Sequence, residues 1–358
     1  MRRMLVLAVL AATLVPAASA DAISRGRAVT PGEAPWLIAI QGRTSTACGG
    51  VLVGADRVLT AAHCVQGAAP GALRLRLGDG PLGQGRRLRV ARIAFPPSYR
   101  LIPSPVNPDN PGMSGSVRDI AVLHLTARVT GVEPITIAAG EPQPGEPTTT
   151  YGRGRTGPAP AAPDGPGQTP PPDTGRGPSA PLAADQVVLA DAACAEPYGS
   201  VLHASLHLCT EDATTGAQAC GGDSGGPVVV RRGGQAQLAG LVTWGGEVRG
   251  RDCGEGLPDV SEQVGRYARL LTQRRAAPYA EARTRVRRAD GVLECVSGPW
   301  HPGNARLRYT WYRLDGRDDV AVPGVTSRRI RARTTPLGCA VRASTAGGWA
   351  EERSYNQR

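Results

Sequence analysis

The chain has 358 residues and a formal net charge of +11, and every basic residue is an arginine because the sequence contains no lysine. This length allows about two to three domains. The arginines are dispersed and lack interleaved aromatic residues, so the composition favours a solvated basic surface over specific nucleic-acid binding.

The first 22 residues are typical of a secretory signal peptide. Arg2 and Arg3 supply the charge, and Met4–Val15 is an apolar run too short to span a bilayer. Two junctions fit the small-x-small cleavage pattern, Ala18-Ser19-Ala20 and Ala20-Asp21-Ala22. We therefore expect a secreted, extracellular protein without a transmembrane segment, cleaved after Ala20 or after Ala22.

Residues 23–275 form short apolar runs separated by Gly/Pro turns, a pattern typical of an all-β fold. Residues 264–273 have helical spacing and predict a closing helix. Residues 157–181 are almost entirely Pro, Gly, Ala, Asp and Thr, so we expect a disordered surface insertion. The expected strands include Trp36–Ile40, Leu73–Leu77, Leu88–Ile93, Val187–Leu189, Val228–Val230 and Leu238–Trp244.

Three short segments carry candidate catalytic residues in the order His, Asp, Ser. His63 lies in Thr60-Ala61-Ala62-His63-Cys64, and Asp119 opens the strand-like segment Asp119-Ile120-Ala121-Val122-Leu123. Ser224 lies in Gly222-Asp223-Ser224-Gly225-Gly226-Pro227, whose glycines permit a tight turn. A serine hydroxyl is a poor nucleophile alone, so this interpretation requires a histidine base and a carboxylate that orients it.

Residues 276–358 are expected to form a second domain, joined by a linker near residues 274–285. Cys295 and Cys339 flank Trp300 and Trp311 in segments of alternating polarity, which favours a small β-sandwich held by one disulfide with both tryptophans in its core. The segment resembles the Ig-like repeats of bacterial secreted and surface proteins. We expect it to bind a cell surface, a polymer or a protein and to carry no catalytic group.

The three segments and their order resemble the trypsin/chymotrypsin family of secreted serine endopeptidases, over about residues 23–275. The resemblance implies two six-stranded antiparallel barrels with the active site between them. It assigns Ser224 as nucleophile, His63 as base and Asp119 as orienting acid, with the backbone N–H groups of Gly222 and Ser224 as the oxyanion hole. It also implies a monomer that acts on proteins or peptides without a cofactor.

The resemblance assigns a substrate pocket whose preference stays open. Gln218 occupies the position of the acid that binds Arg or Lys in trypsin-like members, whereas Asp259 falls on the expected pocket floor opposite Gln218. Asp259 could bind a basic P1 side chain from there, and a polar or apolar P1 is the alternative. Thr243 matches a position whose hydroxyl supports the buried aspartate, and Trp244 and Gly245 match the strand that pairs with substrate.

A second implied pair links Ile23 to Asp223. In the family, cleavage before the matching isoleucine creates an ammonium group that pairs with this buried aspartate and shapes the oxyanion hole. Ile23-Ser24-Arg25-Gly26 departs from the usual Ile-Val-Gly-Gly at its second and third positions. Because signal cleavage after Ala22 would release Ile23 directly, we hypothesise that no zymogen step is needed.

The eight cysteines fit an oxidising compartment. The resemblance implies the pairs Cys48–Cys64, Cys194–Cys209 and Cys220–Cys253, which leaves Cys295–Cys339. The sequence has no Cys-x-x-Cys and its histidines are scattered, so we expect no metal site. The alternative function, from another class, is an inactive protease-like scaffold that acts as an extracellular binding or adhesion protein.

Overall fold

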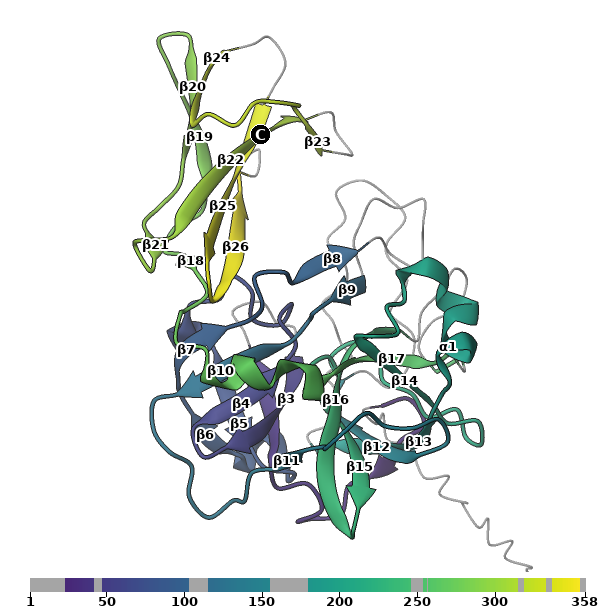
Figure 1. Ribbon diagram of the computed structural model, residues 1–358. Helices are drawn as coiled ribbons and strands as arrows, with labels where there is room; N and C mark the ends of the chain where they lie inside the picture. The colour runs from purple at the N-terminus through teal and green to yellow at the C-terminus, as the bar shows by residue number, and fades with distance from the viewer. Residues whose placement is uncertain are drawn as a thin grey trace, which may run out of the picture.

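The structure, a computed structural model, describes residues 23–41, 47–102, 115–154, 180–245, 254–255, 257–314, 319–332 and 337–354. The expected signal peptide, and nearly all of the expected insertion at 157–181, lie outside the described residues. Within them the chain is mostly β with few helices, which confirms the predicted all-β pattern (Figure 1). No described helix is long and apolar enough to cross a membrane.

The first barrel is a sheet of order β6-β5-β2-β3-β4-β10-β7. Its two end strands, β6 and β7, are separated along the chain only by Arg89, so one bent segment closes the barrel. The prediction of one continuous strand at Leu88–Ile93 is wrong at that bend. The strands are β2 (Leu37–Gln41), β3 (Ala47–Gly54), β4 (Arg57–Thr60), β5 (Arg74–Leu77), β6 (Arg86–Leu88), β7 (Val90–Ala94) and β10 (Ala121–Leu125).

The second barrel is closed by hydrogen bonds between β13 and β14. Its path runs β13-β12-β15-β16-β17-β14, and β14 pairs back with β13, while β1 and β11 extend the sheet. Apolar side chains of these strands, among them Leu208, Val228, Val230 and Val242, pack into a shared core. The strands are β1 (Arg27–Ala28), β11 (Thr136–Ile137), β12 (Pro147–Gly152), β13 (Leu182–Val188), β14 (His207–Glu211), β15 (Pro227–Arg232), β16 (Gln235–Gly245) and β17 (Asp259–Gln263).

Helices are short and peripheral. The predicted closing helix is present as the 3-10 helix η4 (Val264–Thr272), kinked at Tyr267, so its position was predicted and its type was not. The α-helix α1 (Asp191–Tyr198) was not predicted, and it contains Pro197. The remaining 3-10 turns are η1 (Pro70–Ala72), η2 (Leu82–Gln84) and η3 (Gly199–Val201).

The C-terminal part has its own small core. A disulfide joins Cys295 of β20 to Cys339 of β25, and so connects a three-stranded sheet, β19-β20-β24, to a four-stranded one, β23-β22-β25-β26. Trp311 is fully buried between them. The strands are β18 (Tyr279–Ala280), β19 (Arg285–Ala289), β20 (Val292–Val296), β21 (Trp300–His301), β22 (Arg306–Leu314), β23 (Asp319–Ala321), β24 (Arg329–Arg331), β25 (Leu337–Thr345) and β26 (Gly348–Arg353).

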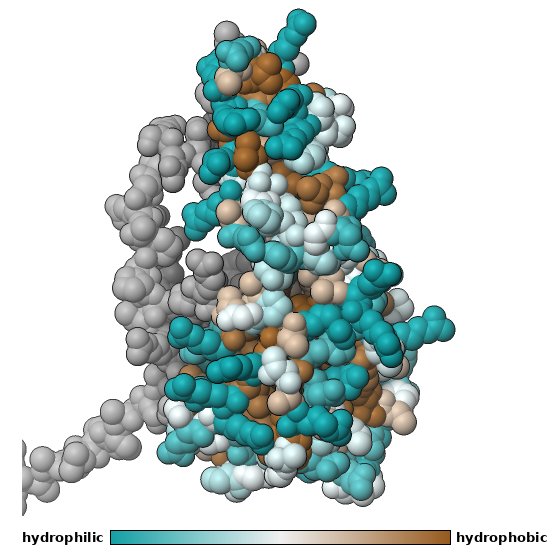
Figure 2. All heavy atoms as spheres, turned by 90° about the vertical axis from the view of Figure 1, so that its left-hand side faces the viewer, coloured by the Kyte–Doolittle hydropathy of each residue, from teal (hydrophilic) through white to brown (hydrophobic). Residues whose placement is uncertain are grey.

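The hairpin between β25 and β26 packs on the first barrel (Figure 1). The N–H of Phe95 donates to the carbonyl of Gly347 at 2.8 Å, and the indole of Trp349 donates to the carbonyl of Tyr99 at 2.9 Å. The rings of Trp349 and Tyr99 stack with centroids 5.9 Å apart. The outer face shown in Figure 2 is mainly hydrophilic on both parts.

A buried carboxylate connects the two barrels. Glu262, on β17 of the second barrel, accepts the N–H of Asp119 from the first barrel at 3.0 Å and the hydroxyl of Tyr267 in η4. Its side chain is fully buried, and the Nε2 of the equally buried His207 lies 3.9 Å away. Burial raises the pKa of Glu262 to about 7 and lowers that of His207 to about 4. His207 is therefore neutral at pH 7.

We predict that Glu262→Gln changes how stability depends on pH. Because the folded state raises the pKa of Glu262, the wild type loses stability as pH rises from about 4.5 towards 7. Glutamine lacks this titration and can still donate to Tyr267 and accept from Asp119. The variant should therefore gain on the wild type by up to about 3 kcal/mol over that range. Urea unfolding at several pH values measures the difference, and parallel stability profiles would contradict it.

Candidate active site

His63 and Asp119 meet where two neighbouring strands begin and end. Thr60, the last residue of β4, pairs with Ala121, the first residue of β10, so the segments that follow and precede them lie together. The Nδ1 of His63 lies 2.6 Å from Asp119 Oδ2, and the backbone N–H of His63 donates to Oδ1 at 2.9 Å. Asp119 is fully buried.

Each of these two side chains stabilises the charged form of the other. Burial alone would raise the pKa of Asp119, but the charge and hydrogen bonds of His63 outweigh it and hold this pKa below its usual value. Burial likewise opposes a charged His63, and the Asp119 carboxylate overcomes it and raises the pKa of His63. The site therefore favours an imidazolium beside a carboxylate.

The turn that carries Ser224 is held between the two barrels. The N–H of Gly49 in β3 donates to the carbonyl of Ser224 at 2.8 Å, and the N–H of Gly225 donates to Val242 in β16 at 2.7 Å. Gly225 has φ of 78°, and a side-chain carbon there would collide with Thr60 Oγ1. Ser224 is thus held beside the strand that leads to His63, with its side chain half-buried.

Asp223 lies in a closed backbone cradle. Its Oδ1 accepts the N–H of Gly154 at 2.6 Å, and its Oδ2 accepts the N–H of Cys220 at 2.8 Å. A side-chain carbon on Gly152 would collide with this carboxylate, so glycine is required there. Gly222, with φ of 101°, gives the same turn its left-handed step.

Ile23 is fully buried, whereas the residue after it reaches the expected pocket. The N–H of Gln218 donates to the carbonyl of Ser24 at 3.0 Å. In the uncut chain Ile23 carries a peptide nitrogen, so the predicted pair between its ammonium group and Asp223 stays a prediction. The side chain of Ile23 packs against Leu182, Ala184 and Ala217.

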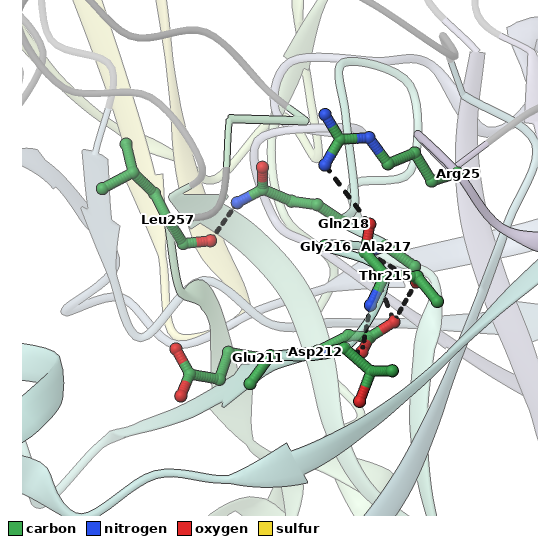
Figure 3. A pocket seen from close by; sticks show the side chains of 10 residues that line it. Arg25, Glu211, Asp212, Thr215, Gly216, Ala217, Gln218 and Leu257 are labelled. Carbon is green, nitrogen blue, oxygen red and sulfur yellow. Dashed lines mark hydrogen bonds between the residues drawn. The ribbon is translucent and has the colours of Figure 1, made fainter.

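Arg25 adopts φ of 56°, where the family pattern has glycine. Its guanidinium donates to the carbonyl of Thr215 at 3.2 Å across a cavity of about 320 Å³ (Figure 3). Gln218 lines this cavity and is fixed by its own hydrogen bonds: its Nε2 donates to the carbonyl of Leu257, and its Oε1 accepts the N–H of Gly254 at 2.6 Å.

Asp259 is buried opposite Gly245 in the β16–β17 register. Its Oδ2 accepts Nε2 of Gln186 at 2.8 Å and the N–H of Ala219 at 3.0 Å. Burial outweighs these donors and raises the pKa of Asp259 to about 7. The carboxylate is therefore held by groups of the barrel interior, and its expected place on the pocket floor opposite Gln218 stays a prediction.

The support predicted for Asp119 comes from a different residue. The hydroxyl of Thr243 donates to the carbonyl of Val260 at 3.2 Å, so its predicted bond to Asp119 is wrong. The hydroxyl that donates to Asp119 Oδ2, at 2.7 Å, belongs to Ser116. Trp244 is buried, and its indole N–H donates to the carbonyl of Ser116 at 3.0 Å. Sequence reasoning missed Ser116, and also Gln186 and Glu262, because none lies in a recognisable motif.

Three disulfides have the pairing that the sequence predicts, and two of them brace this region. Cys48 is bonded to Cys64 and Cys194 to Cys209. Cys220 is also disulfide-bonded, whereas its expected partner, Cys253, lies outside the described residues. Cys48 and Cys64 approach His63, but sulfurs joined in a disulfide supply no thiolate for a metal ion.

Known proteins resemble the barrel region. A family model described as Trypsin matches residues 23–271. The chain is 32% identical over 220 residues to the vitellin-degrading protease of Bombyx mori, which covers 60% of this chain and 72% of that protein. It is 31% identical over 233 residues to kallikrein-7 of Homo sapiens, with 64% and 78% covered.

A solved structure agrees with these matches. Neuropsin, a serine protease expressed in the limbic system of mouse brain, superposes with a TM-score of 0.54 at 26% identity, over 70% of this chain and 98% of its own. The matched residues include both barrels and the segments of His63, Asp119 and Ser224. The chain therefore belongs to the trypsin family and is a serine endopeptidase, a hydrolase.

Proposed function

We propose that Ser224, His63 and Asp119 form the catalytic triad of a secreted endopeptidase. The observation that carries the proposal is the buried Asp119 carboxylate, which accepts both Nδ1 and the backbone N–H of His63. These bonds orient the imidazole, so that its Nε2 is the nitrogen left to accept a proton. The hydrogen bond between Gly49 and Ser224 keeps the nucleophile beside this pair.

The reaction then proceeds in two halves. Ser224 Oγ attacks the scissile carbonyl carbon while His63 Nε2 takes the hydroxyl proton, and the N–H groups of Gly222 and Ser224 stabilise the oxyanion. The tetrahedral intermediate collapses, the C–N bond breaks, and His63 gives its proton to the leaving amine. Water attacks the acyl-enzyme with the same base and releases the acid and free Ser224.

We further propose that cleavage before Ile23 completes the site. The new ammonium group would meet Asp223, a carboxylate that is already buried and surrounded by backbone donors. Full burial of the Ile23 side chain supports this placement. A signal peptide that ends at Ala22 would make secretion and activation one event.

The preference for P1 depends on Asp259. Its buried position opposite Gly245 of β16 supports binding of an Arg or Lys side chain, and its raised pKa implies that the carboxylate is more than half charged only above about pH 7. A polar or apolar P1 is the alternative. The C-terminal part, which we propose to be Ig-like because a disulfide and the buried Trp311 join its two sheets, would bind a cell surface or a polymer.

A fluorophosphonate probe separates the enzyme from the inactive scaffold. Mature wild-type protein should be labelled stoichiometrically, and Ser224→Ala should lose both labelling and peptide hydrolysis, by about a millionfold in kcat. Ser200→Ala, at an exposed serine of η3, is the matched control and should be labelled normally. Unlabelled wild type with a correct N-terminus would favour the scaffold.

The mature N-terminus tests the activation proposal. Sequencing of the secreted protein should find Ile23 first in active material, because only a free ammonium group at that residue can pair with Asp223. Ile23→Gly should lower activity about tenfold or more, since the apolar anchor is lost. Fully active protein that begins at Asp21 would reject the mechanism.

The P1 proposal predicts a ratio that rises with pH. The kcat/KM for an Arg substrate, divided by that for a Leu substrate, should increase through about pH 7, because the shared titration of His63 cancels and that of Asp259 remains. Asp259→Asn should flatten the ratio and lower it about tenfold or more. Asp185→Asn, at an exposed carboxylate of the same barrel, is the control. A flat wild-type ratio would favour an uncharged P1.

A further inference from the structure

Ser116 is one of the residues that donate a hydrogen bond to the carboxylate of Asp119. It is buried in β9 (Gly115–Val117), which pairs with β8 (Arg100–Ile102) just ahead of the aspartate. Its Oγ donates to Asp119 Oδ2 at 2.7 Å, the same oxygen that receives His63 Nδ1 at 2.6 Å. The serine and the histidine therefore share one carboxylate oxygen.

The backbone of Ser116 is anchored from the second barrel. Its carbonyl accepts the indole N–H of Trp244 in β16 at 3.0 Å and Nε2 of His207 in β14 at 3.2 Å. Nδ1 of His207 accepts the N–H of His203 at 3.1 Å, which leaves the proton on Nε2 for the bond to Ser116. Two separate strands thus fix the peptide that presents the hydroxyl.

Among the described residues, Ser116 is the one whose side-chain hydroxyl donates a hydrogen bond to the Asp119 carboxylate. Thr243, where the family resemblance places that donor, is turned to the carbonyl of Val260. Glu262 contacts Asp119 through the backbone N–H and supplies no proton to the carboxylate. The orientation of the Asp119 side chain therefore depends on His63 and Ser116.

We propose that Ser116, anchored by Trp244 and His207, is a positioning residue that orients Asp119 and limits how strongly it holds the proton of His63. The inference rests on the proposed triad. Donation from Ser116 draws negative charge from Oδ2, so its loss leaves more charge facing His63 and raises the pKa of that imidazole. It also frees the carboxylate to rotate, which lowers kcat.

The test compares Ser116→Ala with Ser116→Thr, which keeps the hydroxyl. In the alanine variant kcat should fall about tenfold with KM unchanged, the value of one hydrogen bond to a charged group. The pKa of His63, followed by NMR titration and by the acid limb of kcat/KM, should rise measurably, and the low-field His63–Asp119 proton should shift. The threonine variant should recover most of each change.

Two controls keep the outcomes distinct. Ser261→Ala removes a fully buried hydroxyl that has no hydrogen-bond partner among the described residues, and it should leave the pKa of His63 unchanged. If Ser116→Ala does not fold, His207→Leu removes one of the two donors to the Ser116 carbonyl and should raise the pKa of His63, whereas His207→Gln, which keeps an N–H donor, should leave that pKa near its wild-type value.

If the wild type is active and Ser116→Ala leaves both kcat and the pKa of His63 unchanged, the positioning role is overturned and the proposed triad is not. Equal losses in the alanine and threonine variants would also overturn it, because they indicate a packing role. An inactive wild type whose His63 still responds to Ser116→Ala would reject the proposed function and retain the positioning role.

Discussion

The fully buried carboxylate of Asp119 is the constraint on which the barrel region depends. An uncompensated charge in this interior would be strongly destabilising, so the structure surrounds it with donors from His63 and Ser116. His63 lies in the turn after β4 and Ser116 lies in β9, whereas the groups that hold Ser116 come from β14 and β16. Satisfying one charge therefore ties β9 and the turn after β4 to two strands of the second barrel.

Other buried acids are stabilised by different means. Asp119 stays charged because a cationic partner and hydrogen bonds outweigh burial, and its pKa falls. Asp259 and Glu262 receive neutral donors only, and their pKa values rise to about 7. The same interior thus holds a carboxylate whose charged form is favoured, Asp119, and two carboxylates that can bind a proton near neutrality. This contrast is set by partner chemistry and not by depth of burial.

The parts predictable from sequence were those with local signals. The His63 and Asp119 segments, the all-β pattern, three cysteine pairs and the position of η4 follow from short motifs, alternation or a family resemblance. Arg89 gives no signal of the bend that closes the first barrel, and α1 contains a proline, which argues against a helix.

The missed residues share a different property. Ser116 lies 128 positions before Trp244, and Gln186 lies 73 positions before Asp259, so each contact exists only after the barrels have formed. The resemblance misled at Thr243 for the same reason. A hydroxyl can satisfy itself on any nearby carbonyl, and here Val260 is the acceptor, so position alone did not identify the donor to Asp119.

The hairpin of β25 and β26 also has a geometric consequence. Trp349 stacks on Tyr99, and Tyr99 is followed directly by β8, the partner strand of the one that carries Ser116. These contacts hold the C-terminal part against the first barrel. A ligand bound by the C-terminal part, as proposed above, would therefore be held relative to the triad by the docked hairpin and not by a linker.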